Sequence, residues 1–100
     1  MQEIVINRCW GGYSLSQEAK EWLLKQDALT PSYVNLIGSY RIGWRVRSDK
    51  HLVQCIKELG ERADGEHASL EIVSIPDDVD WQIVDYDGWE HIAERHRTWP

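Results

Sequence analysis

The residues best suited to chemistry in this sequence stand near its C-terminus. Arg95, His96, Arg97 and Trp99 bring two guanidinium groups, an imidazole and an indole into one short segment. Arginine binds phosphate through paired hydrogen bonds, and an aromatic face stacks on a purine. The grouping therefore indicates a ligand that carries both phosphate and base. The alternative is that the cations only stabilise the C-terminal end of a helix, where backbone carbonyls are exposed.

A second group of arginines lies in the middle of the chain. The alternation in residues 41–47 predicts an extended strand with one apolar face, made by Ile42, Trp44 and Val46. Arg45 and Arg47 would then share the other face about 7 Å apart, a spacing that fits two phosphates. The alternative is a solvent-exposed strand face whose arginines pair with nearby carboxylates.

An aromatic residue near the last predicted strand is expected to contact the base of the ligand. Trp81 and Tyr86 are the two candidates, and the alternative for Trp81 is an ordinary place in the core. The complete set of predicted ligand-binding residues is Arg45, Arg47, Trp81, Tyr86, His96 and Arg97.

Catalytic and metal-binding groups are not indicated. Asp87 and His91 stand four residues apart near other carboxylates, but no nucleophile is fixed beside a base. Cys9 and Cys55 have neither zinc-ligand spacing nor a CxxC arrangement. We therefore expect a binding protein without a metal, a cofactor or catalytic residues.

The elements that must position these residues begin with a β-branched strand at residues 2–6. The Gly11-Gly12 pair follows, either to present backbone amides to an anion or to allow positive φ in a tight loop. Ser14 or Ser16 is predicted to cap a helix that ends near residue 27. Residues 28–39, which contain a proline and a glycine, read as a long connection.

The second half of the chain begins with a helix capped by Asp49 and ended by Gly60. Strands at residues 68–75 and 81–85 are predicted to form an antiparallel hairpin. Asp87 then caps a closing helix, with Glu90 reaching back in a capping box. The order β-α-β-α-β-β-α predicts one domain over residues 1–100, of the α+β class, with helices packed over a small, mainly antiparallel sheet.

Composition narrows the range of partners. The formal net charge of −6 argues against a binder of duplex nucleic acid, although residues 41–50 are locally basic. The chain lacks a signal peptide and an apolar run near 18 residues, so we expect a soluble cytoplasmic protein that does not enter membranes. Six Trp and four Tyr with no Phe exceed what a small core can enclose, which favours a homo-oligomer.

Four segments resemble small phage-encoded proteins that counter the bacterial Thoeris defence. They are residues 5–16 with the run Asn7-Arg-Cys-Trp-Gly-Gly-Tyr-Ser, residues 47–60 beginning Arg47-Ser-Asp, residues 70–76, and residues 86–99 with Tyr86-Asp-Gly and Glu94-Arg-His-Arg-Thr-Trp. Together these segments span nearly the whole chain.

The resemblance implies a function without catalysis. Members of this first Thoeris anti-defence family act as sponges: they hold cyclic ADP-ribose isomers made by TIR-domain enzymes, and some oligomerise and hold cyclic oligonucleotides. We therefore expect a cyclic nucleotide as ligand and the cytosol of an infected bacterium as location. The alternatives are a small nucleotide-processing phosphodiesterase and a tryptophan-rich module that binds other proteins.

Overall fold

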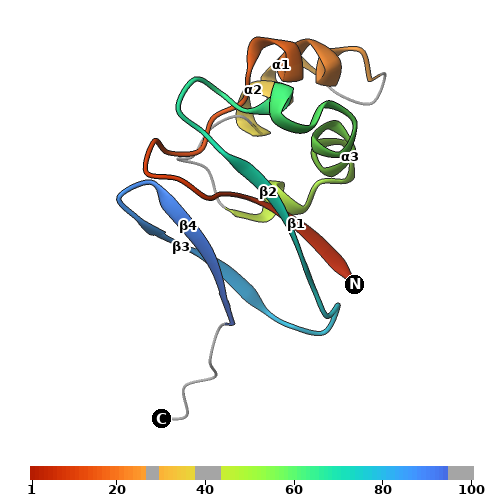
Figure 1. Ribbon diagram of the computed structural model, residues 1–100. Helices are drawn as coiled ribbons and strands as arrows, with labels where there is room; N and C mark the ends of the chain where they lie inside the picture. The colour runs from red at the N-terminus through yellow and green to blue at the C-terminus, as the bar shows by residue number, and fades with distance from the viewer. Residues whose placement is uncertain (27–29, 38–43, 95–100) are drawn as a thin grey trace.

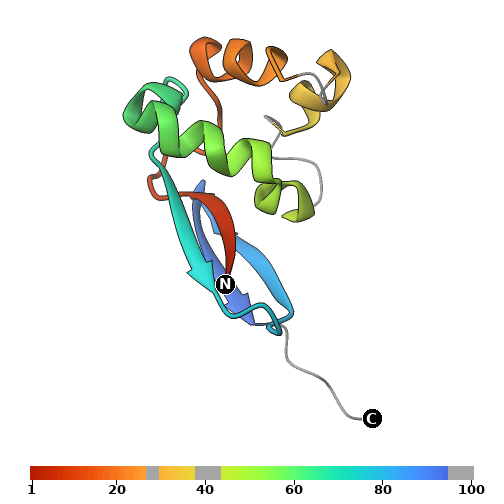
Figure 2. The ribbon, with the colours of Figure 1, turned by 90° about the vertical axis from the view of Figure 1, so that its right-hand side faces the viewer.

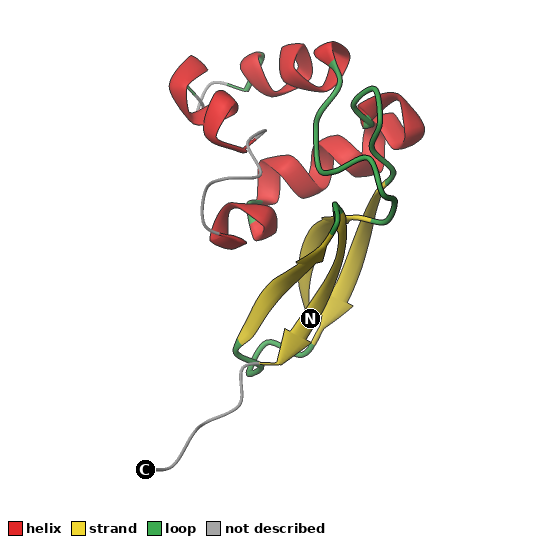
Figure 3. Cartoon of the chain, turned by 90° about the vertical axis from the view of Figure 1, so that its left-hand side faces the viewer, coloured by secondary structure: helices red, strands yellow, loops and turns green. Residues whose placement is uncertain are grey.

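The strands of this protein lie at one end and its helices gather at the other (Figures 1 and 3). A computed structural model describes residues 1–26, 30–37 and 44–94, with the backbone alone described at 35–37, 44 and 45. Its elements are β1 (Gln2–Asn7), α1 (Gln17–Leu24), α2 (Pro31–Ile37), the 3-10 helix η1 (Trp44–Ser48), α3 (Lys50–Leu59), the 3-10 helix η2 (Gly60–Ala63), β2 (Leu70–Ile75), β3 (Trp81–Tyr86) and β4 (Trp89–Glu94). The α+β class predicted from the sequence is confirmed, but the order of elements differs.

The two longer helices begin at the residues that the sequence indicated. Ser16 Oγ accepts a hydrogen bond from Ala19 N–H (3.0 Å) at the start of α1. Asp49 Oδ1 accepts from the N–H groups of His51 (2.8 Å) and Leu52 (3.3 Å) at the start of α3. Gly60, with φ of 57°, ends α3. Side-chain acceptors at these positions satisfy amides that have no partner within the helix.

The middle of the chain corrects two predictions. Residues 30–37, expected to be part of a long connection, contain α2, which begins at Pro31 with Thr30 Oγ1 accepting from Tyr33 N–H (3.2 Å). The strand predicted at residues 41–47 is wrong where the structure describes it, because residues 44–48 form η1. Residues 41–43 lie outside the described part of the chain.

The strands form two antiparallel ribbons, one joining β1 to β2 and the other joining β3 to β4. β2 thus pairs with the first strand of the chain, from Gln2↔Ile75 to Asn7↔Leu70, and the predicted hairpin between residues 68–75 and 81–85 is wrong. β1 lies between β2 and the β3–β4 hairpin (Figure 2). This central place explains why its residues from Ile4 to Asn7 are all buried.

The closing helix predicted from Asp87 is wrong where the structure describes it, because residues 89–94 form the strand β4. Asp87 and Gly88 form the two-residue loop between β3 and β4, and both have positive φ, 53° and 93°, as a type I′ turn requires. Tyr86 pairs with Trp89 directly across this turn. The capping box between Asp87 and Glu90 is therefore absent, and Glu90 points toward β1 as a buried strand residue.

The main apolar core lies between the helices and one face of β1. Its members are Val5, Tyr13, Leu15, Ala19, Leu23, Val34, Leu52, Val53, Cys55, Ile56 and Ala63. The amphipathic α3 contributes four of them, Leu52, Val53, Cys55 and Ile56. Within the described residues, no helix is both long enough and apolar enough to cross a bilayer.

Candidate functional site

The site is built where the β3–β4 turn meets the loop that follows β1 (Figure 1). Their backbones are in direct contact: a Cβ placed on Gly88 would lie 2.6 Å from Trp10 O and 2.8 Å from Gly12 N. Only glycine fits at such an approach, and its positive φ is required by the turn as well. The Asp-Gly turn therefore fixes both the hairpin and its contact with the loop.

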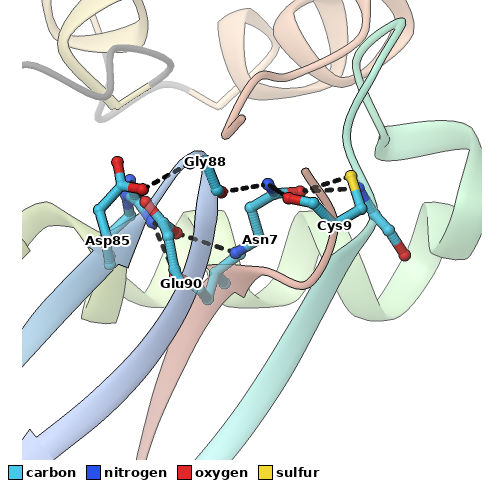
Figure 4. A network of polar contacts seen from close by, with 8 residues as sticks. Asn7, Cys9, Asp85, Gly88 and Glu90 are labelled. Carbon is cyan, nitrogen blue, oxygen red and sulfur yellow. Dashed lines mark hydrogen bonds and ion pairs between the residues drawn. The ribbon is translucent and has the colours of Figure 1, made fainter. Parts of the chain in front are cut away.

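Asn7, at the end of β1, ties these segments together (Figure 4). Its side-chain Nδ2 donates to Gly88 O (2.7 Å) and to Cys9 O (2.8 Å), while Oδ1 accepts from Ser69 N–H (2.8 Å). Cys9 Sγ lies 3.4 Å from the same oxygen and donates to His67 O (2.9 Å). The amide of one buried residue thus joins the turn, the loop and the start of β2.

A pair of charged side chains closes the second edge of β1. Along that edge the backbone groups of Val5 and Asn7 point away from β2, because alternate residues of an antiparallel ladder face opposite sides. Arg47 Nη1 donates to Val5 O (3.3 Å), and Glu90 Oε1 accepts from Asn7 N–H (2.9 Å). Two side chains thus take the place of a neighbouring strand.

The same two side chains form a bidentate ion pair in the interior. Arg47 Nη1 and Nη2 donate to the two carboxylate oxygens of Glu90, at 2.6 and 2.9 Å. Arg47 is 2% exposed and Glu90 3% exposed. The guanidinium carbon also lies 3.4 Å from the centre of the Tyr13 ring, a cation–π contact. Buried charges persist only when they are paired and hydrogen-bonded, and this pair meets that condition at every polar side-chain atom except Arg47 Nε.

Tyr13 shows the electrostatic character of this junction. Burial raises the pKa of its phenol well above the ordinary value, because a phenolate would lose its hydration in the core. Arg47 opposes that shift and Glu90 reinforces it, so the two charges act in opposite directions on the phenol pKa. The ring therefore stays neutral and acts as a flat surface under the guanidinium.

An aromatic cluster lies on the outer side of the same turn. The ring of Trp10 meets Tyr86 edge to face at 5.8 Å between centroids and Trp89 at 5.1 Å. Trp10 is 58% exposed and Tyr86 71% exposed, so the cluster faces solvent. With His91 these three rings line a shallow cavity of about 280 Å³ whose surface is almost entirely apolar.

A second cavity, of about 370 Å³, also has Trp10 in its lining. It is lined by Trp10, Gly11, Gly12, Tyr13, Asp85, Asp87 and Gly88. Asp85 Oδ1 accepts from Gly88 N–H (2.7 Å), which braces the turn. The two carboxylates are the charged groups among these lining residues, so this cavity offers hydrogen-bond acceptors beside an aromatic wall.

The structure separates the residues that the sequence grouped into one site. Arg47 is not on an open strand face, because its guanidinium is enclosed by Glu90 and Tyr13, which corrects its assignment as a phosphate ligand. Trp81 is half-buried, with its indole Nε1 donating to Gln2 Oε1 (3.0 Å). The side chain of Arg45, and the whole of His96 and Arg97, lie outside the described residues.

Trp81 and Tyr86 also do not share a surface. They occupy opposite ends of β3 and, being an odd number of residues apart on a strand, opposite faces of the hairpin. Trp81 lies on the inner face with Glu90, whereas Tyr86 lies on the outer face with Trp89. Tyr86 is therefore available to a ligand, and Trp81 has the half-buried, hydrogen-bonded place of a structural tryptophan.

Sequence reasoning missed Trp10, Trp89 and the carboxylates of Asp85 and Asp87. One signal could have found them: an Asp-Gly pair between alternating apolar residues is a strong sign of a two-residue hairpin turn. That reading of Asp87-Gly88 places Tyr86 and Trp89 side by side.

The Gly11-Gly12 pair has the structural role that was one of its two interpretations. Gly12 has φ of 89°, and a Cβ on Gly11 would lie 1.7 Å from His67 O. Both positions thus exclude side chains for steric or conformational reasons. The loop is thereby held close to β2, and Trp10 projects from it onto the hairpin.

Taken together, the described site offers flat aromatic surface and carboxylate acceptors on a rigid support. Among the described residues, no group of three or more His, Cys, Asp and Glu side chains is placed to hold a metal ion. Comparison with known proteins identifies no relative: no family model, no curated protein and no solved structure matches this chain.

Proposed function

We propose that this protein is a non-catalytic sponge for cyclic ADP-ribose-type nucleotides made by TIR-domain enzymes, acting in the cytoplasm of a phage-infected bacterium. The observation that carries the proposal is the meeting of segments that resemble phage anti-Thoeris proteins. Residues 5–16, Arg47 and residues 86–90 lie far apart in the sequence and join in one network around the turn. Segments that resemble one protein family and meet at one position in the fold are expected to form a functional site together.

The outer aromatic cluster supports binding of a base. Tyr86 and Trp10 present their rings to solvent and are held by contacts with Trp89 and with each other. Stacking of a base on such a ring contributes about 1–3 kcal/mol. Tyr86, and not Trp81, is thus the aromatic residue that we expect to stack on the base.

The phosphates of the ligand require cations from elsewhere. We assign this role to Arg45, His96 and Arg97, because Arg47 is committed to Glu90. β4 ends at Glu94, which pairs with Trp81 at the end of the hairpin away from the turn. At about 3.4 Å per strand residue, that end lies about 17 Å from Trp89.

This distance favours a site shared between protomers. Glu94, the last described residue, lies at the far end of the hairpin from the aromatic cluster. A second copy of the chain would then supply the phosphate-binding groups beside that cluster. We propose a homo-oligomer, a dimer or a higher assembly built from it, with ligand at the subunit boundary. Light scattering of the full chain at micromolar concentration, with and without ligand, should give a mass above that of one protomer; a strict monomer would contradict the shared site.

The function itself is tested by recovery of the ligand. The protein is incubated with a cyclic ADP-ribose isomer, freed of unbound ligand by gel filtration, denatured by heat, and the supernatant is analysed by mass spectrometry. We expect the intact cyclic molecule. Recovery of linear ADP-ribose would contradict the sponge and indicate an enzyme, and recovery of no nucleotide would contradict nucleotide binding altogether.

The phosphate assignment is tested by two substitutions and a matched control. Arg45→Ala and Arg97→Ala should each weaken binding about ten-fold or more, since a hydrogen bond to a charged group contributes roughly 1.5–3 kcal/mol. Lys25→Ala removes an exposed charge at the end of α1 and should leave affinity unchanged. Equal affinity in the two arginine variants and the control would remove the assignment.

A further inference from the structure

We propose that the cavity beside the β3–β4 turn binds the vicinal hydroxyl groups of a ribose, with Asp87 as the principal acceptor and Asp85 as the second. This inference rests on the proposed function and deepens it. It places the sugar of the nucleotide in the cavity beside the turn, and it leaves the phosphates to the basic residues named above. The ribose would lie against one side of Trp10, and the base against the aromatic cluster on the other.

The negative charge of the cavity lining favours a hydrogen-bond donor and disfavours an anionic group. Its lining includes Asp85 and Asp87 and no Lys or Arg side chain among the described residues. A phosphate group placed there would meet two carboxylates at short range, which is unfavourable at any effective dielectric constant. A ribose hydroxyl is uncharged and donates hydrogen bonds, and a carboxylate is the acceptor that commonly binds it in dinucleotide sites.

The acceptors are available and held in place. The carboxylate of Asp87 has no hydrogen bond or ion pair with any described residue, and Asp85 uses Oδ1 for Gly88 N–H while Oδ2 has no such partner. Their backbones belong to a turn fixed by the bond from Asn7 Nδ2 to Gly88 O (2.7 Å). A fixed turn backbone limits the positions that the two carboxylates can reach, which lowers the entropy lost on binding.

Trp10 links this cavity to the aromatic surface. Its ring lines both cavities, of about 370 and 280 Å³. Pockets that hold small molecules commonly enclose about 300–1,000 Å³, so the two together have room for a nucleoside. Base and sugar are joined by a covalent bond in a nucleoside, and the apolar and acidic cavities likewise share Trp10 in their linings.

The test compares two uncharged probes on the full-length protein. Adenosine and 2′,3′-dideoxyadenosine are titrated while tryptophan fluorescence is followed. We expect adenosine to bind about ten-fold more tightly or better, because its hydroxyls donate to a charged acceptor. Asp87→Asn keeps the shape of the side chain, and asparagine also tolerates positive φ. Because its amide oxygen is a weaker acceptor than a carboxylate, the variant should lose most of the preference for adenosine.

The matched control is Asp78→Asn, an exposed aspartate in the β2–β3 connection, which should keep the preference. Equal affinity for the two probes, no binding of adenosine, or an unchanged preference in Asp87→Asn would each overturn the ribose site. Thermal melts of both variants establish that they are folded.

Failure of this inference and failure of the proposed function give different results. Retention of the cyclic ADP-ribose isomer with equal affinity for the two nucleosides would overturn the ribose site and leave the sponge standing. Hydroxyl-dependent binding of adenosine without retention of the cyclic isomer would do the reverse. When both hold, Asp87→Asn should weaken retention of the cyclic isomer about ten-fold.

Discussion

The two sides of the β3–β4 turn reverse the usual distribution of residue types. On the inner side, Arg47 and Glu90 are almost completely buried. On the outer side, Trp10 and Tyr86 face solvent, although large aromatic residues most often contribute to cores and interfaces. Both sides rest on the same few backbone atoms around Gly88.

The difference indicates what each side does. Every oxygen of the Glu90 carboxylate is engaged, and Arg47 has three hydrogen bonds and an aromatic ring under it. Both carboxylate oxygens and both terminal guanidinium nitrogens are thus engaged, with only the buried Arg47 Nε lacking a partner, and the pair fixes the position of the hairpin. The exposed rings contact mainly each other, so on the outer side aromatic surface stays open to solvent. Four substitutions or titrations test this division, in order of expected effect on stability.

The largest loss should follow removal of Glu90. Glu90→Ala leaves the Arg47 guanidinium buried without a counter-charge, which costs roughly 3–5 kcal/mol in comparable sites. Chemical denaturation monitored by tryptophan fluorescence measures it. Glu71→Ala, which removes an exposed partner of Arg8 at 3.6 Å, is the control and should cost less than about 1 kcal/mol. Similar losses in the two variants would show that the inner pair does not hold the hairpin.

Gly88→Ala should follow, with a loss of about 2–4 kcal/mol from unfavourable φ and overlap with the Trp10 carbonyl together. Gly60→Ala is the matched control, because its φ is also positive but a Cβ there meets nothing within 4 Å. It should show the conformational cost alone, about 1–3 kcal/mol. A loss in Gly88→Ala no greater than in Gly60→Ala would mean that the turn and loop can separate freely.

Raising the pH should lower the free energy of unfolding through the buried thiol of Cys55 in the core. Burial, with a smaller effect of Glu58, raises the pKa of the Cys55 thiol from 9.0 to about 11. The folded state therefore holds this proton more tightly, and the resulting stability is complete below pH 9 and is lost as pH rises toward 11. The loss is on the order of 2–3 kcal/mol.

Denaturation midpoints measured at intervals between pH 8 and 11 check this slope. Cys55→Ala should flatten it, while Cys9→Ala, at the half-exposed cysteine, should keep it. An identical slope in both variants would assign the alkaline loss to other groups, of which the buried Tyr13 phenol is the foremost.

The smallest effect on stability is expected on the outer side. Tyr86→Ala should change the free energy of unfolding by no more than about 0.5 kcal/mol, since the side chain is exposed. It should nevertheless weaken nucleotide binding by about 1–3 kcal/mol. Trp81→Ala should do the opposite, because its indole is half-buried and bonded to Gln2. A loss of stability without a loss of binding in Tyr86→Ala would show that this ring supports the fold, as the inner ion pair does, and does not contact the ligand.

Local signals in the sequence predicted much of the fold. Ser16 and Asp49 cap helices because the acceptor and the amides it binds are neighbours in the chain. The same holds for Gly60 at the end of α3 and for the β-branched residues of β1. In each case the deciding interaction lies within a few residues.

The errors arose where distant partners decide. The alternation in residues 41–47 predicted a strand, yet Arg47 belongs to a 3-10 helix that directs its side chain to Glu90, a partner more than forty residues away. Asp87 and Glu90 have capping-box spacing, but Glu90 is used by that same arginine and by Asn7 N–H. The candidate site depends on these long-range contacts. Sequence reasoning therefore included Tyr86 among the ligand-binding residues but did not include Trp10, which lines both cavities.

The closure of the β1 edge by Arg47 and Glu90 has a consequence for solubility. The segment Ile4-Val5-Ile6 combines high strand propensity with low charge, and such a segment with an open edge is a template for aggregation. The ion pair occupies the hydrogen-bonding groups that a second chain would use. Variants that break the pair should therefore be recovered as precipitates or fibres when they are concentrated, at temperatures where the helices are still folded. The two charges thus act as gatekeeper residues for β1.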